Sequence, residues 1–444
     1  MMSPAAPSVL IPRRTHSNGR LARTLDAALA LGICVLLAFG PLALGATEEW
    51  AIFILEEGAA LLLVIWGLRS VTGTRLEISR SPLYLPMLLF AALIGAQLLL
   101  GRTAYWYATW QKALLWAAYA ILLFLAAQCF RRESWLKRFS IACTVFGLAL
   151  AMFAILQKFA GNGKIYWFVP NQAAAEFFGP YMNHSHYAGL MEMLVPFPLV
   201  LAMASYSSSA ARVLYSFAGL IMGSSILLSQ SRGGVIAFVI ELGVLTVLAA
   251  QRRPKHRQLT LLASFCLLLI FCFLLVRPHG LWDRFMQLSG HGHKVQDEHR
   301  LAMAEDSLHM LRARPLLGWG FGTFTAVYPS FRSFYTDLNV NAAHDDFLEL
   351  TAETGLAGLA LAIAFLYLLY RCGASHAKHW RQSPRASTAL AALVGCTGLV
   401  VHSFSDFNLK VPANAAWFFV LAAIAAGATS PYRPAQSARE GSQW

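Results

Sequence analysis

Apolar residues make up 57% of the 444-residue chain and charged residues only 13%, which argues against a soluble globular protein. A bilayer core about 30 Å thick needs roughly 20 apolar residues per helix. On that criterion the chain is an all-α, polytopic membrane protein with about twelve transmembrane helices. The formal charge of +13 then needs no nucleic-acid partner, because basic residues orient the spans and contact anionic membrane lipids.

The distribution of Lys and Arg tests this topology independently. The predicted spans begin near Thr24, Trp50, Pro82, Lys112, Leu136, His186, Arg212, Gly233, Leu259, Thr354, Ala386 and Ala413. With both termini in the cytoplasm, the cytoplasmic segments hold 22 of the 35 basic residues, as the positive-inside rule requires. We therefore expect one transmembrane domain at residues 24–429, between cytoplasmic tails at 1–23 and 430–444.

Residues 277–346 form the one long polar stretch in the chain, and the topology places it on the outer face. Its apolar residues at helical spacing are Leu301, Ala304, Leu308 and Leu311. Pro315 ends this pattern, because proline disfavours helix in the residue before it. Glycines and aromatic residues at 318–322 indicate a turn. We expect the loop to fold back on the bundle as a short helix whose polar side faces a cavity.

Two arginines in or near outer segments are candidates for an anion site. Arg232 precedes Gly233 and Gly234, which would let backbone amides approach an anion at a helix N-terminus. Arg300 opens the predicted loop helix. A guanidinium matches phosphate with a rigid fork of donors, so two arginines could clamp a diphosphate. The competing interpretations are an interfacial Arg232 that reaches lipid headgroups and a solvated helix face for Arg300.

His344 is the candidate general base. A single histidine is more often structural than catalytic, but here Asp345 and Asp346 follow directly, and a carboxylate beside an imidazole can orient it and raise its basicity. Asp345, Glu349 and Glu353 share one face if the segment is helical.

Other polar residues give weaker signals. Asn183, His184 and His186 cluster in an outer segment, and His402 precedes Asp406 and Asn408. These histidines lack convincing metal-ligand spacing, so we expect no metal site. Acidic residues within or at the edges of spans, which are costly and often functional, are Glu56, Glu57, Glu192 and Glu241. The chain has no P-loop, no dinucleotide fingerprint and no HExxH motif, so we expect no nucleotide chemistry.

Taken in order, these motifs resemble the O-antigen ligase and polysaccharide polymerase family of bacterial inner-membrane proteins. The likeness rests on 183–189, 229–234, 300–324, 344–358 and 402–414. It implies a metal-independent, inverting glycosyltransferase without a cofactor. The donor would be a glycan on undecaprenyl diphosphate, used on the periplasmic face. The acceptor would be a lipid A-core sugar or another lipid-linked glycan.

Carried onto this sequence, the resemblance makes His344 the essential histidine and Arg232 and Arg300 the diphosphate contacts. We assign further substrate contacts to Asn183, His186, Asp345 and His402. One departure is that the family often has Asn or Ser at the position of Asp345. That charge leaves room for a different partner of His344, or for a divalent ion.

Three alternatives remain open. A polymerase of lipid-linked repeat units, or a ligase to protein, would share the chemistry and differ in acceptor. A lipid-linked glycan flippase would be expected to show internal repeats and a charged central path. A membrane O-acyltransferase would place its histidine deep in the bilayer, whereas His344 is predicted near the outer surface.

Overall fold

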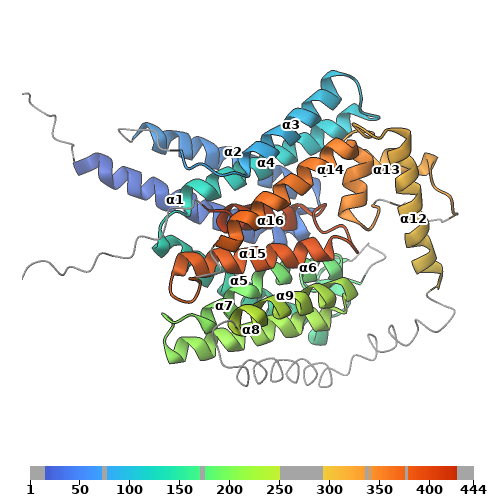
Figure 1. The fold of residues 1–444 in the computed structure, drawn as a ribbon. Helices are drawn as coiled ribbons and strands as arrows, with labels where there is room; N and C mark the ends of the chain where they lie inside the picture. Colours follow the sequence, from blue (N-terminus) through green and yellow to red (C-terminus); the bar gives the residue numbers. More distant parts are fainter. Residues whose placement is uncertain are drawn as a thin grey trace, which may run out of the picture.

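The computed structural model describes residues 16–72, 78–170, 176–250, 294–335, 340, 342–375 and 379–427 (Figure 1). In chain order its helices are α1 (His16–Leu42), α2 (Glu49–Val71), α3 (Tyr84–Leu99), α4 (Trp106–Cys129), α5 (Glu133–Ala160), α6 (His184–Leu194), α7 (Pro196–Met203), α8 (Ser209–Ser229), α9 (Arg232–Ala250), α12 (Lys294–Ala313), α13 (Phe324–Val327), α14 (Asp346–Gly373), α15 (Pro384–His402) and α16 (Pro412–Ala425). A short antiparallel hairpin, β1 (Lys164–Ile165) with β2 (Val169–Pro170), joins α5 to α6. The all-α class is confirmed.

The structure does not confirm the predicted number of membrane spans. Within the described residues nine helical segments are long and apolar enough to cross a membrane, so the chain is a multi-pass membrane protein. One of the nine combines α6 and α7, which Pro196 separates. Helices α3 and α16 have 16 and 14 residues, fewer than the roughly 20 that a span needs. The span predicted near Leu259 lies outside the described residues, so the count of twelve is not confirmed.

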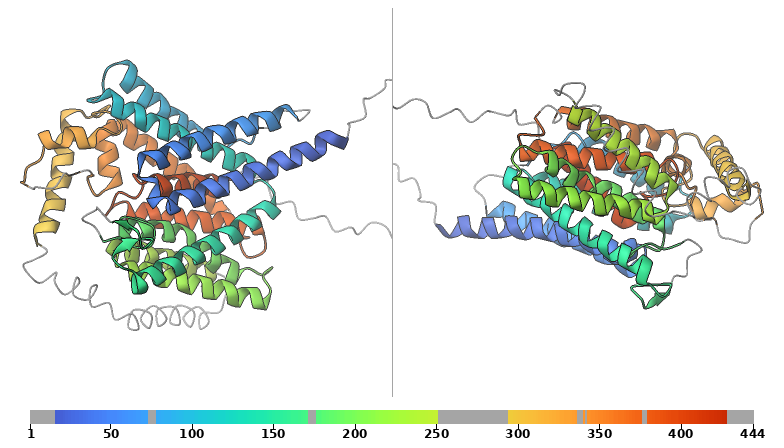
Figure 2. Two further views of the ribbon diagram at one scale, coloured as in Figure 1. Left: turned by 180° about the vertical axis from the view of Figure 1, so that it is seen from behind. Right: turned by 90° about the horizontal axis from the view of Figure 1, so that it is seen from below.

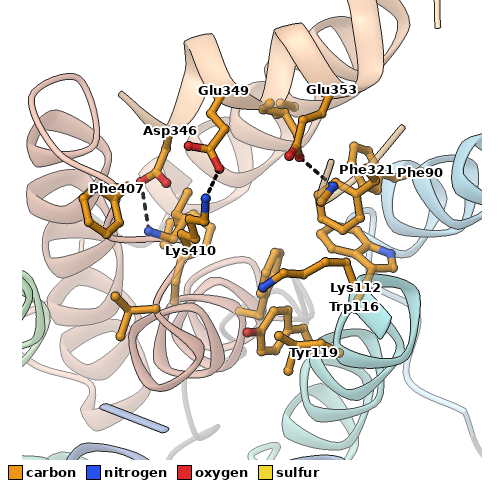
Figure 3. Close-up of a pocket in the computed structure, with 18 of the residues that line it drawn as sticks. Phe90, Lys112, Trp116, Tyr119, Phe321, Asp346, Glu349, Glu353, Phe407 and Lys410 are labelled. Carbon is orange, nitrogen blue, oxygen red and sulfur yellow. Dashed lines mark hydrogen bonds and ion pairs between the residues drawn. The ribbon is translucent and has the colours of Figure 1, made fainter. Parts of the chain in front are cut away.

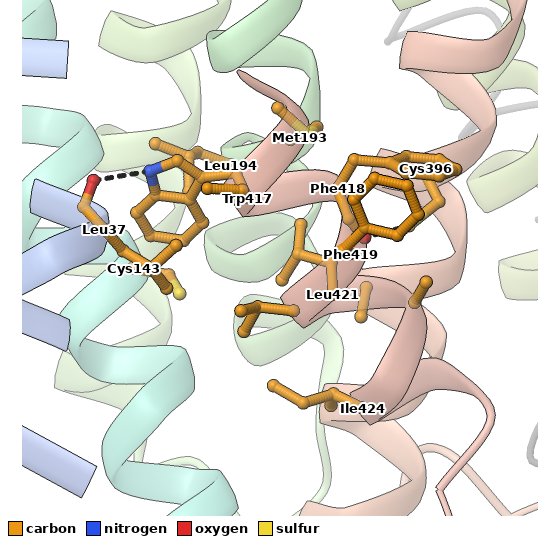
Figure 4. Close-up of a cluster of buried hydrophobic side chains, with 14 of the residues drawn as sticks. Leu37, Cys143, Met193, Leu194, Cys396, Trp417, Phe418, Phe419, Leu421 and Ile424 are labelled. Carbon is orange, nitrogen blue, oxygen red and sulfur yellow. Dashed lines mark hydrogen bonds between the residues drawn. The ribbon is translucent and has the colours of Figure 1, made fainter. Parts of the chain in front are cut away.

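Helix α16 lies at the centre of the bundle, where protein rather than lipid surrounds it. Every residue from Pro412 to Ala425 is buried, as expected for a helix that is apolar all round. The indole of Trp417 donates a hydrogen bond to the backbone oxygen of Leu37 in α1, at 2.7 Å (Figure 4). This bond satisfies a polar group that would otherwise be costly to bury. A buried central helix can be shorter than the bilayer is thick, so apolar composition alone does not decide whether α16 is a span.

Helix α12 confirms the predicted loop helix, but it begins at Lys294 rather than at Arg300, and it buries a different face. The helix ends at Ala313, before Pro315, as expected. Its buried side chains are Met303, Asp306, Ser307 and Met310. Leu301 and Leu308, which suggested the helical spacing, are 74% and 40% exposed. Helices α12 and α13 lie at the end of the bundle opposite the end from which α1 begins (Figure 2).

A break in α14 docks the 314–322 turn onto the bundle. Gly355 has φ 66° and ψ −168°, which interrupts the helix. The turn supplies replacement backbone partners: Leu356 donates to the Pro315 oxygen at 2.8 Å, and Gly320 donates to the Glu353 oxygen at 2.8 Å. An interrupted helix is tolerated in a membrane protein where other protein groups satisfy the freed backbone.

Gly318 is the tightest point of this docking and provides a stability prediction. It has φ 65°, and a Cβ there would lie 2.4 Å from the Glu353 carbonyl. Gly318→Ala should lower the apparent unfolding temperature in detergent, because left-handed strain alone costs about 1–3 kcal/mol. Gly95→Ala in α3 is the control, since nothing lies within 4 Å of its added methyl group. Equal unfolding temperatures for the two variants would contradict this account of the turn.

Candidate active site

The segment between α15 and α16, residues 403–411, organises the candidate site. Its Ser403 oxygen accepts a hydrogen bond from the Asp346 amide at 3.0 Å. Its Leu409 amide donates to Asp346 Oδ2 at 2.9 Å. These two bonds fasten the segment to the first turn of α14. Residues about sixty positions apart in the sequence are therefore held next to one another.

His344 lies beside this segment in a strained conformation. Its φ of 54° falls in the left-handed region, which non-glycine residues rarely adopt and which often marks a functional position. Its Nδ1 is 3.6 Å from Asp406 Oδ1, and its ring packs edge-on against Phe407 with centroids 5.1 Å apart. The side chain is 33% exposed. An imidazole with one nitrogen facing a carboxylate and partial access to solvent suits a proton acceptor.

The acid that faces His344 is Asp406, and not one of the adjacent acids that were expected to orient the ring. Asp345 is instead the N-cap of α14, where its Oδ1 accepts hydrogen bonds from the amides of Phe347 and Leu348 at 2.8 and 3.0 Å. Helix N-termini need such acceptors, so capping occupies the Asp345 carboxylate. Burial raises the pKa of Asp345 despite those two bonds.

The charge state of Asp406 fits a role beside His344. Burial alone would raise the pKa of Asp406, but the His344 side chain and the charges of His186 and His402 hold it well below its usual range. The carboxylate therefore stays ionised at neutral pH. An ionised carboxylate beside an imidazole stabilises the protonated ring.

His402 supports the start of α9 from within the bundle. Its Nδ1 lies 2.9 Å from Glu192 Oε1, and its Nε2 lies 3.4 Å from Ser231 Oγ. His402 and Glu192 are 1% and 0% exposed. The Ser231 hydroxyl also accepts from the Gly234 amide at 3.1 Å. This buried series of hydrogen bonds orients the turn that leads into α9, whose first residue is Arg232.

Arg300 and the end of α9 that carries Arg232 both lie at the 403–411 segment. A guanidinium nitrogen of Arg300, on α12, donates to the Ser405 oxygen at 3.4 Å. Arg232 is half-buried, and a Cβ on its neighbour Gly233 would lie 2.4 Å from Ser405 Oγ and 2.6 Å from His402 Cδ2. The structure thus brings His344, His402, Arg300 and the Arg232 helix end to one segment.

Two other predicted contacts line or brace the same region. Asn183 caps α6, where its Oδ1 accepts from the Ser185 amide at 2.8 Å. His186 is buried with its ring 4.7 Å from that of Phe407, and its Nε2 has no hydrogen-bond partner among the described residues. Phe407 therefore lies in contact with both His186 and His344.

A cavity of about 560 Å³ adjoins the cluster on the side of His186 and Phe407 (Figure 3). Its charged lining residues are Lys112, Asp346, Glu349, Glu353 and Lys410. Of Asp345, Glu349 and Glu353, which were expected to share one face, Glu349 and Glu353 line this cavity, whereas Asp345 caps α14 and does not. Burial alone would lower the pKa of Lys410, but Glu349 and Glu353 raise it. No described residue of α12 lines this cavity, so the loop helix does not face it with its polar side as expected. The charged groups come from α14, the 403–411 segment and, through Lys112, α4.

Lys112 and Lys410 were not predicted as site residues. The fourth span was predicted to start at Lys112. The helix begins six residues earlier, at Trp106, which places Lys112 in its second turn. A cation inside a helix that can span the membrane was the signal that could have identified it.

Comparison with known proteins supports the interpretation of the motifs. Residues 217–363 match the family model described as O-antigen ligase. The match contains Arg232, Arg300 and His344, and ends before His402 and Asp406. No curated protein matches the chain. Over residues 217–363, this match confirms the resemblance of the chain to the O-antigen ligase family.

Proposed function

We propose that the protein is an inner-membrane glycosyltransferase that moves a glycan from undecaprenyl diphosphate to an acceptor sugar on the periplasmic face. The observation that carries the proposal is the meeting of His344, Asp406, Arg300 and the Arg232 helix end at the 403–411 segment. A base and two cations at one place suit the attack of a hydroxyl on a sugar with a diphosphate leaving group. The position of α12 at the end of the bundle opposite the start of α1 supports a periplasmic site (Figure 2).

In this proposal His344 takes the proton of the acceptor hydroxyl. Its Nδ1 faces Asp406, so Nε2 is the nitrogen that accepts the proton as the acceptor oxygen bonds to the anomeric carbon. The bond from that carbon to the diphosphate oxygen breaks, and its electron pair leaves with undecaprenyl diphosphate. Attack opposite the leaving group inverts the anomeric centre. Asp406 stabilises the imidazolium, so the charged pair forms without a metal ion.

Arg232 and Arg300 act on the leaving group in this proposal. The diphosphate gains negative charge as the glycosidic bond breaks, and fixed cations aimed at developing charge are commonly the largest catalytic contribution. Arg232 also opens α9, where unpaired backbone amides and the helix dipole favour an anion. The buried His402–Glu192 pair keeps this helix end in position.

The glycans made by a deletion strain show which acceptor the protein uses. We expect lipid A-core to lose all long chains while lipid-linked polymer is retained, because a ligase performs the last transfer. Restoration by the wild-type gene, but not by a His344→Ala gene, would link the phenotype to the site. An accumulation of single repeat units would instead identify a polymerase, and unchanged glycans would contradict both.

A second measurement separates an enzyme from a flippase. Purified protein in detergent micelles should transfer glycan from the lipid-linked donor to lipid A-core. A flippase moves lipids between leaflets and makes no glycosidic bond, so a new covalent product in micelles would exclude that alternative. Wild-type protein that supports glycan export in cells but forms no product in micelles would favour the flippase.

A further inference from the structure

The cavity beside Phe407 is divided into a charged end and an aromatic wall. It lies among α3, α4, α14 and α16, and its wall includes Phe90, Trp116, Phe365 and Phe419. Its five charged residues lie toward one end (Figure 3). A volume of about 560 Å³ is within the range of pockets that hold small ligands. Such a division suits an amphiphile with a charged head and a hydrocarbon chain.

The carboxylates at the charged end already have partners. Glu353 accepts from the amides of Gly322 and Phe324, each at 2.8 Å. Glu349 Oε1 pairs with Lys410 at 2.5 Å, and Glu349 Oε2 accepts from the Ala343 amide at 2.9 Å. The Asp346 carboxylate accepts from a backbone amide as well. These acids hold the surrounding turns in place.

Lys112 differs from these acids. Its ammonium group points into the cavity (Figure 3), and no hydrogen bond or ion pair joins it to the described residues. Its stem is closely packed, because a Cβ on Gly322 would lie 2.3 Å from Lys112 Cγ. With φ at 82°, Gly322 is the residue type that leaves room for this lysine. A half-buried ammonium group that forms no hydrogen bond or ion pair with the described residues can accept a contact from an anionic ligand, even though carboxylates line the same cavity.

We propose that this cavity binds the phosphorylated head of a membrane lipid, with the phosphate between Lys112 and Lys410 and the hydrocarbon chain against the aromatic wall. A lysine binds phosphate as a point charge, and two lysines line this end. The inference rests on the proposed function, in which substrates are phosphorylated lipids. Phe407 lines the cavity and contacts His344, so the bound lipid lies next to the proposed base.

The test measures lipid binding by the purified full-length protein, using native mass spectrometry in detergent. The probes are undecaprenyl diphosphate, bisphosphorylated lipid A, phosphatidylglycerol and zwitterionic phosphatidylcholine. Lys112→Gln should weaken the binding of at least one phosphorylated probe by about tenfold or more. This is the loss expected from removing one charge-assisted hydrogen bond. Lys112→Arg should retain most binding. Lys164→Gln is the control, because Lys164 is exposed on β1 and away from the cavity.

The pattern of loss identifies the source of the phosphate. Loss confined to lipid A assigns the cavity to the acceptor, which leaves the donor diphosphate at Arg232 and Arg300. Loss confined to undecaprenyl diphosphate assigns the cavity to the donor and moves that diphosphate away from the two arginines. Loss of phosphatidylglycerol alone assigns it to a bilayer lipid. If Lys112→Gln folds poorly, the test instead measures whether inorganic pyrophosphate displaces bound lipid from the wild type. Equal binding of all phosphorylated probes by the wild type and Lys112→Gln, or no displacement by pyrophosphate, would overturn the inference.

Failure of this inference is separable from failure of the proposed function. His344 does not line the cavity, so His344→Ala should bind the lipid as the wild type does while losing transfer. Normal transfer by His344→Ala would remove the proposed mechanism and leave the lipid site standing. Normal lipid binding by Lys112→Gln would remove the lipid site and leave the mechanism standing.

Discussion

His344→Ala should abolish detectable glycan transfer while leaving membrane insertion and protein level unchanged. A positioned general base contributes about 10²–10⁴-fold in rate, and His344 is the imidazole that combines partial exposure with a facing carboxylate. The measurement is product formation in micelles from a lipid-linked donor, at matched protein concentrations. His309→Ala is the control, because His309 is exposed on α12.

Asp406→Asn separates the positioning of His344 from its chemistry. The variant keeps the size of the side chain and removes the negative charge 3.6 Å from Nδ1. We expect kcat to fall while KM for the acceptor changes little, because the charge stabilises the imidazolium that forms during reaction. A larger fall for Asp406→Ala than for Asp406→Asn would show that side-chain shape contributes as well. An effect on KM alone would contradict the positioning role.

Metal dependence provides an independent check on the base. The proposal has no metal ion, so EDTA should leave the rate unchanged. Strong inhibition by EDTA that an added divalent ion reverses would point to Asp345 and Asp346 as ligands. Near-normal transfer by His344→Ala would remove the base altogether.

Hydropathy predicted the helices well because a membrane helix carries its signal in local composition. It does not decide whether α16 is a span, for a physical reason. A helix surrounded by protein and a helix surrounded by lipid are both apolar on all sides, so composition cannot distinguish a buried 14-residue helix from a span. Composition also mispredicted the buried face of α12, because Leu301 is apolar and yet exposed.

The sequence was enough to predict which residues belong to the candidate site, but not which of them pair with one another. Arg232, Arg300 and His344 stood out by their place in outer segments, and the structure brings their surroundings together. The partner of His344 could not be foreseen, because Asp406 lies sixty-two positions away and reaches it only through the bonds that fasten 403–411 to α14. The left-handed backbone of His344 likewise carries no signal in composition.

Arg232 and Arg300 should each be needed for the departure of the diphosphate. Arg232→Ala should raise the transfer barrier by about 2–4 kcal/mol if its contact forms in the transition state. Arg232→Lys keeps the charge and loses the bidentate fork, so it should still be slower than the wild type. Arg312→Ala is the control, because Arg312 is exposed on the same helix as Arg300. The measurement is single-turnover transfer from the lipid-linked donor, which isolates the chemical step from product release.

A double-mutant cycle tests whether the two arginines bind one group. If Arg232 and Arg300 contact the same diphosphate, their losses should not add, because removing one cation already leaves the leaving group misplaced. Strictly additive losses would indicate separate anions, one at the start of α9 and one beside Ser405. Full activity in both single alanine variants would leave the diphosphate clamp without support. It would also move the search for the leaving-group cation to Lys112 and Lys410, the two lysines that line the neighbouring cavity.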